Sequence, residues 1–180
     1  VRRNPEKNVH KPYIQPRVMA KGDSFFIRAN VTTNNTTFAQ AEIDLGSFVN
    51  LGVSSASLLK IHQIDVQYAD ATDAGGNIYY DAAVGGATTM WQLTTQSQSD
   101  LVYAYDKSVA ATGALRLWVD PTTTAHVSAV SEKTDINPSD FTNGYLCAVD
   151  SLFLGTKQSA AMDSGEVVIS LILECEIVKS

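Results

Sequence analysis

Apolar and polar side chains alternate near the C-terminus of the chain. Between residues 166 and 178 every second position is apolar, and these apolar residues are Val167, Ile169, Leu171, Leu173, Cys175 and Ile177. Polar residues such as Ser170 and Glu174 occupy most of the positions between them. A period of two is typical of a strand with one face in a core. We therefore expect a long strand here, with Leu171 and Leu173 buried between two sheets.

Shorter segments with the same alternation precede this one. They predict strands at 24–31, 39–45, 59–68, 88–95, 101–105, 115–119 and 145–154. The last of these carries apolar residues at both parities, which is typical of a strand that is central in its sheet or buried on both faces. Pairs of turn-forming residues, such as Asn143-Gly144, separate the segments.

The alternation changes phase within the segment 59–68. Leu59 and Ile61 share one parity, whereas Ile64 and the apolar residues after it share the other. A slip of one residue near His62 and Gln63 is what a β-bulge produces.

Helical periodicity is absent from every 12-residue window of the sequence. Short helical turns are expected only at 54–60 and 138–141, where Ser or Asn stands at the N-cap position. About eight strands with long loops in 180 residues predict an all-β protein, a two-sheet antiparallel jelly-roll sandwich. This length suits one core, so we expect an extended N-terminal arm at 1–22 and a single jelly-roll domain at 23–180.

Basic residues are concentrated at the N-terminus. Residues 1–28 carry seven of the thirteen Lys and Arg side chains and a net charge of about +5, whereas the rest of the chain carries about −11. The expected contact residues of the arm are Arg2, Arg3, Lys7, Lys11, Arg17 and Lys21. Their partner is nucleic acid, an anionic lipid surface or the acidic flank of a neighbouring subunit, and a solvated tail without contacts is the alternative. Prolines among these charges favour an extended arm.

Catalytic and metal-binding motifs are absent from the sequence. The histidines His10, His62 and His126 are scattered, and neither His-x-His nor a GxSxG nucleophile motif occurs. We therefore predict that the protein is not an enzyme and has no cofactor. Four carboxylates near a Gly-rich loop would suit Ca²⁺, but their spacing does not match an EF-hand, so no metal site is predicted; these residues are Asp65, Asp70, Asp73 and Asp81.

The two cysteines, Cys147 and Cys175, lie within apolar strand patterns. Cysteines in this setting usually act as small buried side chains. A disulfide between neighbouring strands is the alternative.

This architecture resembles the small single jelly-roll capsid proteins of icosahedral viruses. The resemblance rests on the basic arm, the opening strand at 24–31, the number of strands and the long final strand. The stretch 148–155, Ala-Val-Asp-Ser-Leu-Phe-Leu-Gly, resembles the end of the barrel in short capsid proteins of archaeal and bacterial viruses, in which upright barrels surround a membrane-enclosed DNA genome. The resemblance implies a virion protein that assembles with copies of itself and with other capsid proteins. The arm lacks a dense Arg run, so its contact with nucleic acid or an internal membrane is expected to be weak.

A carbohydrate-binding or adhesin module is the alternative function, because such modules are also Thr-, Ser- and Gly-rich β-sandwiches. They bind sugars through exposed aromatic rings, for which the candidates are Trp91, Trp118, Tyr79 and Tyr80. Both tryptophans lie in strand patterns, so we expect them to pack instead.

Overall fold

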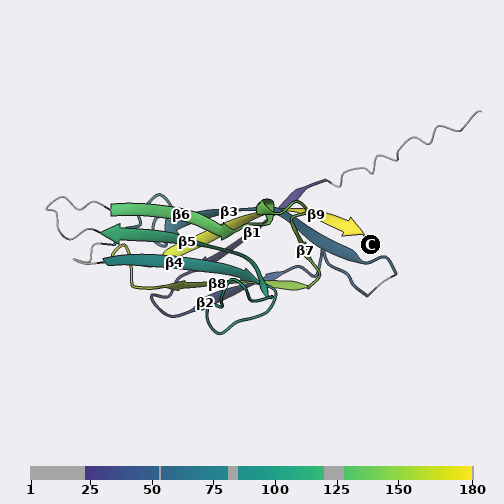
Figure 1. Ribbon diagram of the computed structural model, residues 1–180, viewed down its shortest axis with the longest axis horizontal. Coiled ribbons are helices and arrows are strands. Elements are labelled where there is room, and N and C mark those ends of the chain that lie inside the picture. Colours follow the sequence, from purple (N-terminus) through teal and green to yellow (C-terminus); the bar gives the residue numbers. More distant parts are fainter. Residues whose placement is uncertain (1–22, 53, 81–84, 120–127, 180) are drawn as a thin grey trace, which may run out of the picture.

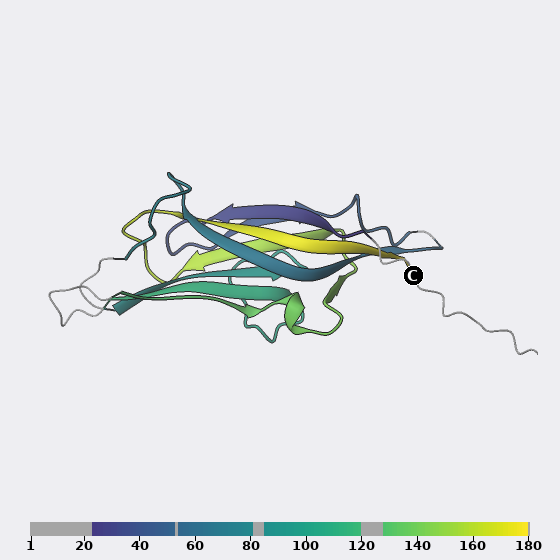
Figure 2. The same cartoon turned by 90° about the horizontal axis from the view of Figure 1, so that it is seen from above.

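The chain folds into two antiparallel sheets that lie face to face, as a computed structural model shows from two directions (Figures 1 and 2). The structure describes residues 23–179 except for 53, 81–84 and 120–127. The four-stranded sheet has the order β1-β9-β3-β7, with β1 (Phe25–Thr32), β9 (Val167–Lys179), β3 (Ser57–Asp70) and β7 (Tyr145–Cys147). The five-stranded sheet has the order β2-β8-β4-β5-β6, with β2 (Ala39–Asp44), β8 (Ser151–Gln158), β4 (Gly85–Thr94), β5 (Val109–Val119) and β6 (Ser128–Ile136).

The strand order is that of a jelly roll. The chain changes sheet at every step between consecutive strands except from β4 to β5 and from β5 to β6. The order β1-β9-β3-β7 therefore faces β2-β8-β4-β5, which is the arrangement of eight strands in two interleaved Greek keys. The strand β6 adds a ninth beside β5. The predicted fold class is confirmed, whereas the predicted arm at 1–22 lies outside the described residues.

The inner face of β9 forms the centre of the core. Leu171 and Leu173 are 1% and 0% exposed, as the alternation predicted. Ile177 is 41% exposed, because the end of β9 extends beyond the facing sheet. Trp91 of β4 is fully buried in the same core, and its Nε1 donates to the hydroxyl oxygen of Tyr68 on β3 at 2.9 Å.

The predicted bulge lies in β3. The register between β3 and β9 shifts between Ile61 and Gln63. The intervening His62 places Nε2 3.0 Å from Oε2 of Glu176 on β9. After the bulge β7 no longer pairs with β3, and the side chain of Asn137 takes its place by accepting from Ile64 N at 3.1 Å and donating to Ile64 O at 2.7 Å.

Asn137 also begins the one helical turn that the prediction placed correctly. The 3₁₀ helix η1 (Pro138–Asp140) is capped by Asn137 at its N-terminus, and Asn137 N donates to Asp140 Oδ2. No helix in the described ranges is long and apolar enough to cross a membrane.

Three sequence predictions are wrong. The segment 54–60 is not a helical turn, because from Ser57 onward it pairs with β9 and buries Leu59. The segment 101–105 is not a strand and lies in the β4–β5 loop. The segment 145–154 is two strands, since the chain leaves β7 after Cys147 and enters the other sheet at Ser151. Only the second of these, β8, is central in its sheet.

The strand β6 was not predicted at all. Its sequence, Ser-Ala-Val-Ser-Glu-Lys-Thr-Asp-Ile, has no run of alternating apolar residues. It forms the edge of the five-stranded sheet, where charged side chains discourage pairing with another chain. From Val130 to Asp135 every side chain but that of Thr134 is exposed, so β6 has no buried apolar face that periodicity could reveal.

The two cysteines are buried and do not form a disulfide, as the sequence analysis predicted. Cys147 lies opposite Leu59, and Cys175 lies opposite Ile61, so β3 runs between them. Two strand spacings amount to roughly 9–10 Å, which exceeds the span of about 7 Å that a disulfide can bridge. Burial raises the pKa of the Cys147 thiol and raises that of Cys175 to about 12.

Three glycines of the five-stranded sheet lie beneath aromatic rings. A Cβ atom at Gly113 would come within 2.8 Å of Trp91 Nε1, and one at Gly86 would come within 2.9 Å of the Trp118 ring. At Gly155 it would come within 2.7 Å of the ring of Phe38. The rings therefore cover bare backbone, and any larger residue at these positions would displace them.

We expect the two faces of β9 to differ sharply in their tolerance to substitution. Leu171→Ala leaves a cavity in the core and should lower the free energy of unfolding by about 2–5 kcal/mol. Glu174→Gln on the outer face should change it by about 0.5 kcal/mol or less. Urea unfolding of the unassembled subunit measures both values. A larger loss for Glu174→Gln than for Leu171→Ala would mean that the face assignment is wrong.

Candidate interaction surface on the β4–β5 loop

The loop at 95–108, between β4 and β5, folds back over the outer face of the five-stranded sheet. Gln92 on the outer face of β4 is 3% exposed because the loop covers it. Its Nε2 donates to the carbonyl oxygen of Val102 at 2.5 Å, and its Oε1 accepts from Val102 N at 2.9 Å. One side-chain amide thus satisfies both backbone groups of Val102, as a neighbouring strand would.

A second glutamine holds the beginning of the loop. Gln40 on β2 donates from Nε2 to Ser97 Oγ at 2.8 Å and accepts from Gln98 N at 2.9 Å. At the base of the loop Ser108 O accepts from Thr95 N at 2.8 Å. The loop is therefore joined to β2, to β4 and to its own ends.

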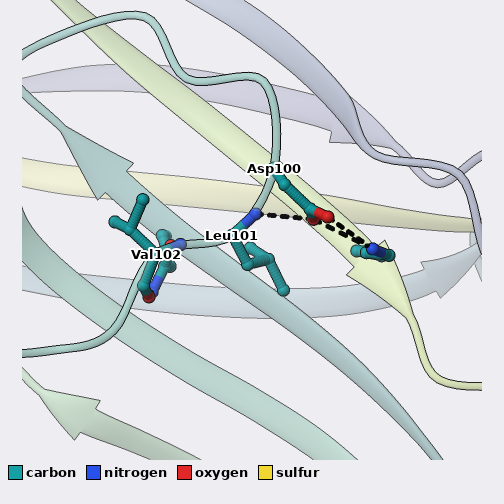
Figure 3. Close-up of polar contacts among 5 residues, drawn as sticks. Asp100, Leu101 and Val102 are labelled. Carbon is teal, nitrogen blue, oxygen red and sulfur yellow. Dashed lines mark hydrogen bonds and ion pairs between the residues drawn. The ribbon is translucent and has the colours of Figure 1, made fainter.

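An ion pair fixes the middle of the loop, as the close-up in Figure 3 shows. Nζ of Lys157 on β8 lies 2.7 Å from Oδ2 of Asp100, whose Oδ1 accepts from Leu101 N at 2.8 Å. The hydrogen bond from Lys157 is the main reason that the pKa of Asp100 is lowered. Asp106 near the end of the loop also has a lowered pKa, because it accepts from both the backbone N and the hydroxyl of Ser108.

The anchored loop presents two aromatic side chains to solvent. Tyr103 and Tyr105 are 76% and 87% exposed. Their rings stack with centroids 5.5 Å apart and planes inclined by 7°. Large aromatic rings that are already held in place bind partners at low entropic cost, and tyrosine is enriched among residues that dominate binding energy. The pair is the most exposed aromatic surface among the described residues.

Two adjoining hollows lie beside the stacked rings. One, of about 360 Å³, is lined by Met90, Asp100, Leu101, Val102, Tyr103 and Lys157. The other, of about 170 Å³, shares Met90, Leu101 and Lys157 with it. Their lining combines apolar side chains with the charged Asp100 and Lys157, a mixture that is also found in protein-contact surfaces.

The other predicted residues do not form a site together. The six arm residues Arg2, Arg3, Lys7, Lys11, Arg17 and Lys21 lie outside the described residues. Asp70 stabilises a turn: its Oδ1 accepts from the hydroxyl and backbone N of Thr72 and from Asp73 N, and these bonds lower its pKa. The described residues include no group of three His, Cys, Asp or Glu side chains that could hold a metal ion.

The aromatic candidates for sugar binding separate into buried and exposed rings. Trp91 is buried and packs as predicted, and Tyr80 is half-buried. The expectation that Trp118 packs in the same way is wrong, because it is 57% exposed where it covers Gly86 at the outer face. Tyr79 is 52% exposed.

Sequence reasoning missed Tyr103 and Tyr105 because it placed 101–105 in a strand. Turn-forming residues enclose the segment on both sides, among them Ser97, Asp100, Asp106 and Ser108. Asp and Ser in such positions bind nearby backbone groups and favour turns over strands. This signal was available in the sequence.

Comparison with known proteins gives only distant likenesses. No family model matches the chain, and no curated protein matches it. Merkel cell polyomavirus VP1, solved in complex with disialyllactose, is 10% identical with a TM-score of 0.41 over 91% of this chain and 98% of that chain. New Jersey polyomavirus VP1 is 8% identical with a TM-score of 0.44 over 88% of this chain and 99% of that chain. The cryo-EM structure of mud crab dicistrovirus is 11% identical with a TM-score of 0.34 over 99% of this chain and 79% of that chain.

These three neighbours are viral capsid proteins with jelly-roll folds. None of them comes from an archaeal or bacterial virus, so they do not support that part of the sequence resemblance. Identities and TM-scores as low as these do not place the chain in a family. The fold assignment rests on the strand order alone.

We expect Gln92→Ala to release the loop without unfolding the sandwich. Removing the amide leaves both backbone groups of Val102 without their partner. Losing about 1.4 kcal/mol of local stability should raise the hydrogen-exchange rate of the Val102 amide roughly tenfold. Gln67→Ala, at an exposed position of β3, is the control and should leave that rate unchanged. Unchanged exchange in Gln92→Ala would show that the other contacts suffice to hold the loop.

Proposed function

We propose that this chain is a viral capsid protein whose copies assemble into an icosahedral shell around the genome, and that it therefore resides in the virion. The observation that carries the proposal is the jelly-roll order of the strands, joined in one chain to a basic N-terminal segment of opposite charge to the body. The division into an arm at 1–22 and a jelly-roll domain at 23–180 is part of the proposal. No catalytic activity is proposed for it.

A closed shell needs complementary surfaces on each subunit. The stacked rings of Tyr103 and Tyr105 and the hollow over Met90 and Leu101 supply an apolar contact on the outer face of the five-stranded sheet. Because both rings are so exposed, a contact between subunits would bury a large apolar area on them. We assign this surface to contacts between subunits, either copies of this chain or other capsid proteins.

The arm supplies a second, electrostatic contact. Its proposed contact residues are Arg2, Arg3, Lys7, Lys11, Arg17 and Lys21. The acidic body of a neighbouring subunit offers charges of opposite sign. Nucleic acid and the anionic headgroups of an internal membrane would attract the same side chains, more weakly because the arm lacks a dense Arg run.

A carbohydrate-binding or adhesin module is the second candidate function. The exposed faces of Tyr103, Tyr105 and Trp118 favour it, because sugars stack on accessible aromatic rings. The two functions differ in oligomeric state. A stable monomer that binds immobilised glycans through these rings would favour the module, whereas assembly without glycan binding favours the capsid protein.

The double substitution Tyr103→Ser/Tyr105→Ser should weaken assembly without loss of the fold. Both rings are exposed, so unfolding free energy should change by about 0.5 kcal/mol or less. Loss of a binding hot spot of about 2 kcal/mol should raise the concentration needed for assembly roughly thirtyfold. Light scattering against concentration measures this shift, and Tyr79→Ser on a different loop is the matched control. Unaltered assembly of the double variant would remove these rings from the proposed contact.

Deleting residues 1–20 should leave a folded β protein that assembles poorly or into particles of another size. The described strands and core begin after this segment, which supports the expectation that the sandwich survives. Circular dichroism tests the fold, and sedimentation velocity tests the assembly. A full-length variant with the six basic arm residues changed to Gln separates charge from length. Loss of the β-type spectrum on deletion would instead make the arm part of the fold.

A further inference from the structure

A hollow of about 350 Å³ lies at the end of the sandwich where β1 begins. One side comes from the β2–β3 loop and the other from the link between β7 and β8; the lining residues are Val49, Asn50, Leu51, Ala148, Val149 and Asp150. Figure 1 shows the start of β1, the β2–β3 loop and the end of β9 at this same end of the molecule. Neither the tyrosine surface nor the outer face of the five-stranded sheet contributes to it.

Backbone hydrogen bonds hold the two sides of the hollow together. Leu45 N donates to Asp150 O at 2.7 Å, and Val49 N donates to Leu45 O at 2.9 Å. Asn50 exchanges two backbone bonds of 2.9 Å with Ser57 at the start of β3. The hollow is thus a fixed feature of the fold. Its apolar side chains differ in exposure, since Leu51 is 55% exposed, Val149 is half-buried and Val49 is buried.

The two chain segments that form the hollow are acidic, and one base, Lys179, lies opposite Ser57, which bonds to Asn50 of the lining. The segments 39–57 and 143–153 contain three carboxylates and no Lys or Arg. These carboxylates, Glu42, Asp44 and Asp150, are all exposed. An apolar hollow with an acidic rim suits a segment in which apolar residues lie between basic ones.

The chain itself supplies such a segment. The ring of Phe25, at the start of β1, stacks on Phe48 with centroids 5.0 Å apart, and Phe48 directly precedes Val49 of the hollow. The chain therefore enters the fold beside the hollow. The preceding residues 17–21 read Arg-Val-Met-Ala-Lys, with three apolar residues between two basic ones. An extended segment of this length spans roughly 13 Å and lies only a few residues from Phe25, so it is within reach.

We propose that residues 17–21 dock into this hollow of their own chain. Met19 covers Leu51 and Val149, and Arg17 and Lys21, which lie on the same side of an extended segment as Met19, lie toward the carboxylates of Asp44 and Asp150. Docking fixes the direction in which the arm leaves the sandwich. It leaves Arg2, Arg3, Lys7 and Lys11 free for the contacts proposed above. This inference refines the role of the arm but does not require that a shell forms.

Chemical cross-linking of the full chain, at a dilution where it is unassembled, tests the proposal. A short thiol cross-linker is applied to the double variant Ala20→Cys/Ala148→Cys, which has one thiol in the arm and one in the lining of the hollow. The comparison is Ala20→Cys/Lys179→Cys. Because Phe25 pairs with Cys175, an arm that simply continued β1 beside β9 would place residue 21 opposite Lys179 and residue 20 one position beyond it. The native Cys147 and Cys175 are buried, and single-cysteine variants correct for their slow reaction.

The proposal predicts that the Ala148 pair links about tenfold faster than the Lys179 pair, because docking raises the local concentration of one thiol at the other. Asp44→Lys/Asp150→Lys should abolish this difference, and the control Asp65→Lys on the outer face of β3 should preserve it.

Equal rates, or a faster Lys179 pair, would overturn the proposal. So would a cross-link between Ala20→Cys of one copy and Ala148→Cys of another in a mixture of single variants, since the occupant would then be a second chain. None of these outcomes depends on particle formation, so a failure here leaves the capsid proposal standing.

Discussion

The sandwich depends on β9, the strand that closes the four-stranded sheet. It lies between β1 and β3, both of which come much earlier in the chain, and its inner face buries Leu171 and Leu173 against the other sheet. These long-range pairings must form before the two sheets can exclude water, so the entropy of loop closure opposes them until the core is assembled. Other features follow from this pairing. The bulge at His62 keeps β3 in register with β9, and Asn137 satisfies the backbone of Ile64 where β7 ends.

The sequence was informative wherever one strand face is buried and the other is solvated. The alternation in β9, the phase change in β3 and the turn at Pro138 all correspond to local physical causes, namely burial, a bulge and a cap. Sequence periodicity failed where the structure of a segment depends on contacts with distant parts of the chain. The segment 145–154 reads as one apolar strand, but a jelly roll requires the chain to change sheet within it. The strand β6 buries no apolar face, since its side chains from Val130 to Asp135 are exposed except for Thr134, so periodicity could not reveal it.

The candidate interaction surface was even less accessible to sequence reasoning. Gln40 and Gln92 look like ordinary outward-facing strand residues, yet each satisfies groups of a loop that folds back over the sheet. The apolar residues at 101–105 suggested a strand, whereas Leu101 lines the hollow beside Tyr103. By contrast, the charge of the arm is evident from composition alone. The contact of the basic arm can therefore be predicted from the sequence, whereas the contact at Tyr103 and Tyr105 can be recognised only from the folded loop.

Imaging of the full-length chain in its assembled form, at a resolution that places side chains, tests the central claim most directly. The account predicts closed particles of uniform size, in which Tyr103 and Tyr105 on the outer face of the five-stranded sheet are buried between subunits. Closed symmetry follows if each copy presents the same complementary surfaces. A chain that stays monomeric at every concentration and salt condition would contradict the account, and particles with both tyrosines facing solvent would contradict its assignment of the contact.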